Sequence, residues 1–383
     1  MRRTRTRALA ALALAGVLTM AGCAKDSGNE GGNQQASGGQ AGNCVTAEPP
    51  PAPPAKSSAA TTSAKGNVDA SDLRVGLAYD VGGRGDASFN DAAARGVDRA
   101  KKQLGVTEVK ESTAGADESQ AAKQQRLVQM AEQGYDPIIA VGFAYAPALK
   151  VVAPKFPDTQ FAIVDSAAVE QPNVTPLVFA EEQGSFLVGA AAVYKSKNCH
   201  IGFIGGVQTP LIQKFEAGYV QGARAVSDKV EIEIDYLTPA GDLSGFNDPS
   251  KANVEAKAQI QKGADVLYHA AGKSGKGMFQ AAKQAGVLAI GVDSDQYKQP
   301  TLQNVNDVIM TSMLKRVDVA VFSYIKAVAS DNLDSLPERF DLSVDGVGYS
   351  TSGGMIDDIV PQLEAYKHAI VTGKIEVSDK PKE

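Results

Sequence analysis

A glycine-rich loop at residues 80–91 carries the side chains best suited to hold a ligand. It reads Asp80-Val-Gly-Gly-Arg-Gly-Asp-Ala-Ser-Phe-Asn-Asp91 and opens onto a helix start. Glycines let the backbone approach a ligand closely, and helix N-termini present free N–H groups. The loop is not a dinucleotide fingerprint, because the Gly-x-Gly at 83–85 is followed by Ser88 where a third glycine is required. The carboxylates of Asp80 and Asp86 would also repel a phosphate.

A second glycine-rich stretch, at residues 272–277, resembles a phosphate-binding Walker loop only in part. It reads Gly272-Lys-Ser-Gly-Lys-Gly277, and the glycine that the motif needs five positions before Gly272 is Leu267. The sequence therefore predicts neither binding of a nucleotide phosphate nor a cofactor.

Patterns of catalytic and metal-binding residues do not occur in the sequence. The three histidines, His200, His269 and His368, lack a ligand spacing such as His-x-x-x-His, and there is no Gly-x-Ser-x-Gly nucleophile elbow. An acid–base pair, as in a nucleoside hydrolase, is an alternative that would draw on Asp80, Asp86, Asp91, Asp165 and Asp293. Binding explains these aspartates more simply, so we expect neither an enzyme nor a metal site. The net charge of −6 without a basic run argues against nucleic acid as a partner.

Short apolar runs alternate with helical patterns from Leu73 onward, and these elements would position the loops. Runs such as 138–141 and 287–292 are apolar without alternation, which is typical of parallel strands covered on both faces. Ser88 and Asp91 form a capping-box-like start for the first helix. The expected strands are 73–79, 106–110, 137–141, 160–165, 175–180, 200–204, 230–237, 265–270, 287–292 and 308–311.

Two α/β halves are favoured over one large sheet. The helix-to-strand step at 129–138 resembles the one at 260–267, and ten strands would make an unusually wide single sheet. Ligands of open parallel sheets bind beyond the carboxyl ends of the strands, so two facing lobes would form a cleft around a small molecule.

The order of motifs resembles that of the basic membrane protein family, bacterial lipoproteins similar to purine-nucleoside receptors. The resemblance covers residues 73–372, and the loop at 80–91 is its most specific part. The other matching segments are 142–143, 156–165, 205–206, 215–222, 270–277, 291–295 and 312–315. The resemblance implies an α/β fold of periplasmic-binding-protein type I, with two doubly wound parallel-sheet lobes, a hinge and an interlobe cleft. The resemblance implies that the ligand is a nucleoside, with a purine nucleoside as the family's pattern, passed to an ABC transporter permease.

The same resemblance divides the chain into segments. Lobe 1 would comprise residues 71–182 and about 312–335, and lobe 2 would comprise 183–311 and about 336–372. Residues 373–383 would form a tail. A sensor or adhesion lipoprotein with the same fold is the alternative function.

The resemblance also implies ligand-binding residues. Phe89 and Phe215 match an aromatic sandwich for the base, although both also lie on apolar helix stripes and core packing is the alternative. Asp293 and Lys315 match a carboxylate and an ammonium group that hold ribose hydroxyls, the alternatives being a helix cap and a surface lysine. Asn90 would meet a base edge or bond at the helix start. The remaining ligand-binding candidates are Asp80, Gly142, Phe143 and Gly272.

Lys273 and Lys276 depart from the family pattern, in which this loop is usually uncharged. Two lysines here would favour tolerance of an anionic group, and the base preference stays open.

The N-terminus has the pattern of a lipoprotein signal peptide. Arginines among the first seven residues precede an apolar stretch at 8–21 that is too short for a membrane span, and Met20-Ala-Gly-Cys23 resembles a lipobox. We expect a signal peptide at 1–22, lipidation of Cys23 and a disordered Gly/Ser/Pro tether at 23–70, which would place the protein on the outer face of the cell membrane. An ordinary secretion signal is the alternative. Cys44 and Cys199 could pair as a disulfide that clips this tether to the body, or remain two unrelated thiols.

Overall fold

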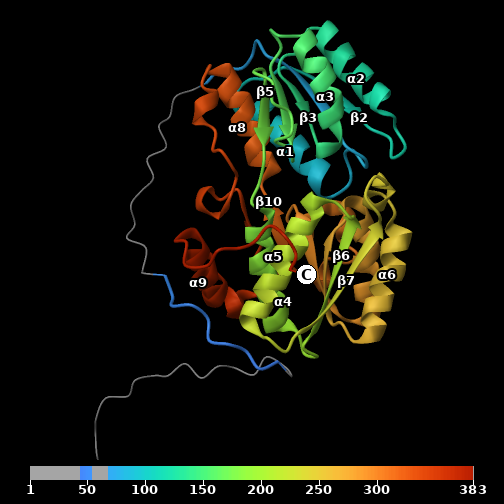
Figure 1. Ribbon diagram of the computed structural model, residues 1–383, viewed down its shortest axis with the longest axis vertical. Helices are drawn as coiled ribbons and strands as arrows, with labels where there is room; N and C mark the ends of the chain where they lie inside the picture. The colour runs from blue at the N-terminus through green and yellow to red at the C-terminus, as the bar shows by residue number, and fades with distance from the viewer. Residues whose placement is uncertain (1–43, 54–67, 383) are drawn as a thin grey trace, which may run out of the picture. The chain divides into compact units, whose positions relative to one another are not determined.

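Two mostly parallel β-sheets organise the folded chain (Figure 1). The computed structural model describes residues 44–53 and 68–382. The first sheet has the strand order β2-β1-β3-β4-β5, and its pairings are all parallel. Its strands are β1 (Arg74–Tyr79), β2 (Glu108–Thr113), β3 (Ile138–Ala140), β4 (Phe161–Val164) and β5 (Val174–Leu177).

The second sheet repeats this topology and adds one antiparallel strand at its edge. Its order is β11-β10-β9-β8-β6-β7, and only the pairing of β10 with β11 is antiparallel. Its strands are β6 (His200–Val207), β7 (Glu231–Thr238), β8 (Val266–Ala270), β9 (Leu288–Asp293), β10 (Ile309–Lys315) and β11 (Val347–Tyr349). In both sheets the first strand lies between the second and the third, which is a doubly wound order and confirms the predicted fold class. The short β11 was not predicted.

Helices cover both faces of the first sheet. These are α1 (Phe89–Gln103), α2 (Gln120–Glu132), α3 (Ala146–Val152) and α8 (Val317–Ala329). Strand β1 shows why both faces are covered: Leu77 packs in one apolar cluster with α1 and α8, and the next residue, Ala78, packs in another with α2 and α3. We call this sheet with its helices lobe 1.

The remaining helices belong with the second sheet and form lobe 2 with it (Figure 1). They are α4 (Glu181–Lys195), α5 (Pro210–Val226), α6 (Pro249–Lys262), α7 (Gly275–Ala285) and α9 (Val360–Val371). Helices α4 and α5 pack very closely because of glycines. A Cβ at Gly189 would lie 2.1 Å from the carbonyl oxygen of Tyr219, and one at Gly222 would lie 1.9 Å from that of Phe186. Only glycine allows this contact, which holds α5 and its Phe215 close to α4.

Within the described residues, the chain passes between the lobes three times. It does so from β5 to α4, from β10 to α8 and from α8 to β11. The first and third passages touch, since the N–H of Ala180 donates to the carbonyl of Phe340 over 3.0 Å and the rings of Phe179 and Phe340 are 5.3 Å apart. The second passage follows Lys315 and not the residues near 312, because β10 stays paired with β9 as far as Leu314.

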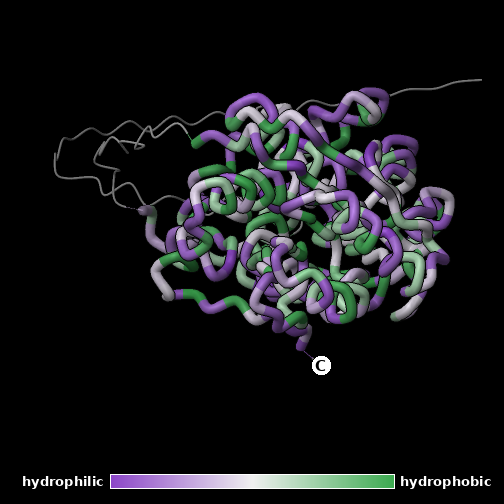
Figure 2. The backbone as a smooth tube through the Cα atoms, turned by 90° about the horizontal axis from the view of Figure 1, so that it is seen from above, coloured by the Kyte–Doolittle hydropathy of each residue, from purple (hydrophilic) through white to green (hydrophobic). Residues whose placement is uncertain are grey.

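Apolar segments lie mainly inside the folded part, and hydrophilic segments lie mainly along its outline (Figure 2). Strands β3 and β4 are buried along their whole length, as expected for strands without alternation. Among the described residues, no helix combines the length and apolar character needed to cross a membrane.

Residues 44–53 are attached to lobe 2 by a disulfide. Cys44 pairs with Cys199, which directly precedes β6, with a Cα–Cα distance of 4.9 Å. The N–H of Ala47 also donates to the carbonyl of Val226 at the end of α5. Part of the expected tether therefore packs on the body. The predicted lipidation site, Cys23, and the signal peptide lie outside the described residues.

Candidate functional site

One cavity collects the loops at the carboxyl ends of strands from both sheets. The space between its atoms measures about 560 Å³, including the part open to solvent, which is within the usual range for small-molecule sites. The nine ligand-binding residues predicted from the sequence all line it. The full lining is Asp80, Val81, Asp86, Phe89, Asn90, Gly142, Phe143, Asp165, Leu211, Ile212, Phe215, Phe246, Ala270, Gly272, Val292, Asp293 and Lys315.

Aromatic rings form much of the apolar wall. Phe89 is the first residue of α1 and is half-buried, so it packs partly on the core and partly into the cavity. Phe215 comes from α5 and is almost fully buried. The ammonium group of Lys315 lies 5.2 Å from the ring centre of Phe89 and 5.5 Å from that of Phe215. The same ammonium group is therefore within the range of cation–π attraction of both rings.

Lys315 is the centre of a buried ionic cluster. Its Nζ lies 2.6 Å from Oδ1 of Asp165 and 3.2 Å from Oε1 of Glu181, and all three side chains are at most 5% exposed. Asp165 follows β4 of lobe 1, whereas Lys315 ends β10 of lobe 2. The alternative interpretation of Lys315 as a solvated surface residue is therefore wrong.

Surplus negative charge determines how this cluster ionises. Burial opposes the charged form of Lys315, but the nearby carboxylates of Asp165, Glu181 and Asp293 outweigh burial and raise the pKa of Lys315. Burial also raises the pKa of Asp165, against the lowering effect of Lys315. Lys315 thus stays protonated among these carboxylates, while the carboxyl groups of Asp165 and Asp293 hold their protons to higher pH than usual.

Asp165 and Asp293 adopt the backbone conformation that favours glycine. Their φ angles are 69° and 63°, a region that is costly for residues with a side chain and that concentrates at functional sites. Each ends or follows a strand in a different lobe, and each directs its carboxylate into the cavity lining. Burial raises the pKa of Asp293, while Lys315 and a hydrogen bond from Ser88 lower it.

The loop at 80–91 is organised by its own carboxylates. The Asp86 side chain accepts hydrogen bonds from the N–H groups of Ser88, Asn90 and Asp91, so Asp86 caps α1. The predicted capping box does not form, because the Ser88 hydroxyl makes no cap contact and donates instead to Asp293 over 2.6 Å. Asp86 satisfies the same helix N–H groups, which leaves that hydroxyl available.

Asn90 lines the cavity, but its amide is already bonded within the loop. Its Oδ1 accepts from the N–H of Asp80, and its Nδ2 donates to the carbonyl of Val81 and to Asp86. Asn90 therefore shapes the loop. Gly142 is required for a different reason, since a Cβ there would lie 2.3 Å from Oδ2 of Asp80 and its φ is 105°.

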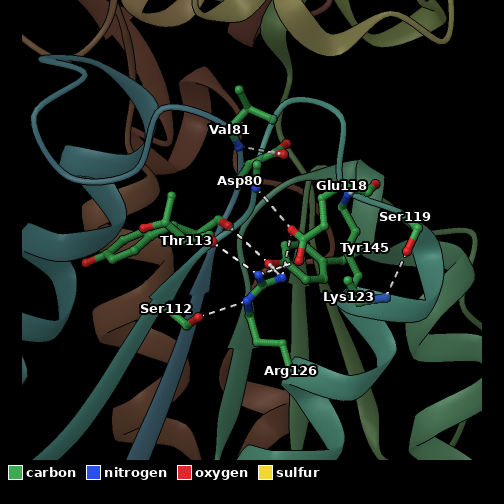
Figure 3. A network of polar contacts seen from close by, with 12 residues as sticks. Asp80, Val81, Ser112, Thr113, Glu118, Ser119, Lys123, Arg126 and Tyr145 are labelled. Atoms are coloured by element: carbon green, nitrogen blue, oxygen red, sulfur yellow. Dashed lines mark hydrogen bonds and ion pairs between the residues drawn. The ribbon is translucent and has the colours of Figure 1, made fainter.

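A polar network lies behind Asp80 (Figure 3). Arg126 donates to Glu118 and to the hydroxyl of Tyr145, which in turn donates to the carbonyl of Tyr79. The buried ammonium of Lys123 donates to the carbonyl of Glu118. Burial raises the pKa of Asp80 to about 6, partly offset by the Val81 N–H and by Lys123.

Gly272 begins a short 3₁₀ turn and has a φ of 53°. A Cβ there would lie 3.2 Å from the carbonyl oxygen of Phe246, so the cavity wall is made of backbone at this point. Lys273 is exposed, and neither it nor Lys276 lines the cavity.

Sequence reasoning missed part of the lining. Asp165 was recognised only as one of several aspartates, although its place after a buried strand was a usable signal. Glu181 and Phe246 had no such signal, because Glu181 reaches Lys315 from the first turn of α4 and Phe246 lies in an irregular segment.

Comparison with known proteins decides the family. The model of the Bmp family, described as ABC transporter substrate-binding protein PnrA-like, matches residues 74–381. The chain belongs to the Bmp family. Its members are substrate-binding proteins of ABC transporters and not enzymes. Among the described residues, no group of three or more His, Cys, Asp or Glu side chains is arranged to hold a metal ion.

Relatives of this Bmp-family chain include proteins from distant organisms. It is 32% identical over 330 residues to the ABC transporter nucleoside-binding protein BmpA of Lactococcus lactis subsp. cremoris, covering 81% of this chain and 90% of the relative. It is 35% identical over 297 residues to an uncharacterized lipoprotein of Pyrococcus abyssi, covering 73% and 70%. A crystal structure of an ABC transporter solute-binding protein from Aeropyrum pernix K1 superposes with a TM-score of 0.69 at 28% identity, covering 81% and 94%. The predicted two-lobed fold of periplasmic-binding-protein type I is thereby confirmed.

Proposed function

We propose that this Bmp-family protein is a lipid-anchored receptor that captures a purine nucleoside for an ABC transporter. One observation carries the proposal: aromatic walls and a carboxylate–ammonium pair line the same cavity, and they match the two halves of a nucleoside. A nucleoside has a flat base, which suits aromatic faces, and a sugar with vicinal hydroxyls, which suits charged hydrogen-bonding groups. The name of the related L. lactis protein supports the same ligand class.

Asp293 and Lys315 are the proposed ribose contacts. The carboxylate of Asp293 can accept hydrogen bonds from two hydroxyl groups, and the ammonium of Lys315, which lies 2.6 Å from Asp165 and 3.2 Å from Glu181, carries a third N–H donor. Because Asp165 and Glu181 hold the ammonium in place, little side-chain entropy is lost when a sugar binds.

Phe89 and Phe215 are the proposed base contacts, and Asp80 would face the polar edge of the base. Asn90 holds the backbone of Asp80 in place. Gly142 leaves room for the Oδ2 of Asp80. A carboxylate in this position accepts from ring N–H and amino groups, which purine bases offer.

The charge of the cavity argues for a nucleoside and against a nucleotide. Its lining contains the carboxyl groups of Asp80, Asp86, Asp165 and Asp293, but only one cation, Lys315. A phosphate in this space would be repelled by the surplus negative charge. The tolerance of an anionic group suggested by Lys273 is not part of the proposal, because this lysine is outside the lining.

Thermal unfolding with added ligand tests the proposal. Inosine, guanosine or adenosine at 100 times its Kd should stabilise the fold by about 2.7 kcal/mol through mass action. Free ribose, the free base and the 5′-monophosphate should give much smaller shifts. A stronger shift with an amino acid or a free sugar than with every nucleoside would contradict the proposed ligand. Mass spectrometry of co-purified small molecules would identify the ligand directly.

The proposed anchor has its own test. Metabolic labelling with a fatty acid should mark the wild-type protein and not a Cys23→Ser variant, which should be released from the membrane fraction. Equal membrane retention of both proteins would contradict lipidation at this position. The related lipoprotein of P. abyssi supports the expected anchor.

A further inference from the structure

A set of hydrogen bonds joins the start of α1 in lobe 1 to the end of β9 in lobe 2. The Ser88 hydroxyl donates to Oδ2 of Asp293 over 2.6 Å, and the Ser294 hydroxyl donates to the carbonyl of Ser88 over 2.6 Å. Arg95 donates to the Ser294 hydroxyl over 2.7 Å, and Nε2 of Gln296 donates to the carbonyl of Ala87 over 3.1 Å. These contacts run along one edge of the cavity, since only Asp293 among them lines it.

The Ser88 side chain bonds across the lobes to Asp293 and does not cap the helix that it precedes. Its side chain is fully buried, and its hydroxyl makes no hydrogen bond to the first turn of α1. Asp86 takes over the capping role by accepting from several N–H groups of that turn. The hydroxyl thus occupies one oxygen of Asp293 and leaves Oδ1 for another donor.

Gln296 is fixed in the orientation that directs its donor to lobe 1. Its Oε1 accepts from the N–H of Val292 over 2.9 Å and lies 2.9 Å from Nε2 of His269. The N–H of Ala271 donates to Nδ1 of His269, so the proton of this buried, neutral imidazole is on Nε2. With its oxygen held by two donors, the amide of Gln296 must present its NH₂ group to Ala87.

We propose that Ser88 and Gln296 form an interlobe latch that positions Asp293 and slows the release of ligand. The latch consists of the contacts between Ala87, Ser88 and Arg95 of lobe 1 and Asp293, Ser294 and Gln296 of lobe 2. The ligand part of this inference rests on the proposed function. Separation of the lobes breaks these bonds and also frees the Asp293 carboxylate to rotate. Ser88 and Gln296 are therefore positioning residues that act through Asp293 and through lobe closure.

Release kinetics test the latch. Ser88→Ala should raise koff for the nucleoside about tenfold, because one hydrogen bond to a charged group is lost, while kon changes little. Ser185→Ala is a matched control, since this buried serine contacts Tyr268 within lobe 2. Stopped-flow binding would measure both rates. An unchanged koff, or an equal rise with the control, would overturn the latch.

Interlobe distances test the latch without any ligand. Spin labels at Lys102→Cys on α1 and Lys257→Cys on α6, both exposed positions, report the separation of the lobes. Ser88→Ala and Gln296→Glu should each shift the distribution to longer distances. The glutamate keeps the size and the acceptor but removes the donor that faces Ala87. Unchanged distributions would overturn the latch. Failure of the wild type to bind any nucleoside would instead overturn the proposed function and leave this distance result to decide the latch.

Discussion

The ammonium group of Lys315 lies 2.6 Å from Oδ1 of Asp165, and this ion pair crosses from lobe 2 to lobe 1. Lys315 is the last residue of β10, and Asp165 follows β4. The two side chains are 1% and 5% exposed, so the net strength of the pair depends on how well its charges and hydrogen bonds compensate for the loss of hydration. A residue that we propose as a ligand contact therefore also helps to hold the two lobes together.

Lys315→Met should destabilise the protein strongly at neutral pH. Removal of the cation leaves the buried carboxylate of Asp165 without its partner and leaves Glu181 with Lys214 alone, 3.6 Å from its Oε2, which costs about 3–5 kcal/mol. Urea unfolding at pH 7.5 would measure this loss.

The loss should shrink at lower pH. Burial already raises the pKa of Asp165 above its usual 3.8, and without Lys315 this pKa rises further. The folded variant then binds more protons than the unfolded chain, so its stability increases as the pH falls through that window. If Lys315→Met lost the same free energy of unfolding at pH 5 and at pH 7.5, the unpaired buried carboxylates would not be the cause of the loss. A Lys367→Met variant, which removes an ion pair with the exposed Asp345, should have little effect at either pH.

Asp293→Asn should weaken nucleoside binding about 10- to 100-fold, because the carboxylate is the proposed acceptor for ribose hydroxyls. Asparagine tolerates the positive φ of 63° at this position and still accepts from Ser88, so the fold should persist. Isothermal titration would compare inosine with 2′,3′-dideoxyinosine. The wild type and the variant should bind the dideoxy compound equally weakly. A variant that binds inosine like the wild type would contradict the ribose assignment.

Asp80→Asn should stabilise the unliganded fold at neutral pH while weakening ligand binding. Burial raises the pKa of Asp80 to about 6 from 3.8, so the folded state holds this proton more tightly than the unfolded chain. Stability is therefore lost as pH rises from about 4 to 6, by roughly 3 kcal/mol at one pKa unit per 1.4 kcal/mol.

The stability of the asparagine variant should fall less than that of the wild type over this pH range, because the amide does not titrate while buried carboxyl groups such as Asp86 and Asp165 still do. Unfolding free energies at pH 4.5 and pH 7.5 would measure the difference, which should favour the variant only at the higher pH. A variant less stable than the wild type at pH 7.5 would contradict this prediction. It would show that the Val81 N–H and Lys123 stabilise the ionised carboxylate by more than its burial destabilises it.

Much of the fold was predictable because its physical signals are local. Unbroken apolar runs and glycine stops located most strands, and the motif order indicated two lobes. The end of β10 was less accessible, because Met313-Leu314-Lys315 continues a buried strand with a charged residue. The ion pairs with Asp165 and Glu181 make this burial possible. Strand β11 has three residues and depends on its partner β10, so no local pattern marks it.

The site was predictable where a residue type had a chemical role near a strand end. Asp293 and Lys315 are examples, and both line the cavity. Ser88 shows the limit of such reasoning. Its spacing to Asp91 predicted a capping box, but tertiary contacts gave the cap to Asp86 and the Ser88 hydroxyl to Asp293. Two residues more than 200 positions apart cannot be paired by a local rule.

Cys199→Ala, or reduction of the disulfide, should detach residues 44–53 from lobe 2 without changing ligand affinity. The bond joins residues 155 positions apart, and loss of such a crosslink costs about 2–5 kcal/mol of stability. Cys199 precedes β6, whereas the cavity is reached from the other end of this eight-residue strand, about 26 Å away.

Limited proteolysis with mass analysis should show cleavage within 44–53 in the reduced wild type and in the variant, but not in the oxidised wild type. The variant should not respond further to reductant, which separates this bond from any other effect of the reagent. In the variant, tension on the proposed lipid anchor at Cys23 would reach the body through Val68 and no longer through the disulfide of Cys44. A protease pattern that is the same with and without the disulfide would show that other contacts, such as that between Ala47 and Val226, suffice to hold the segment.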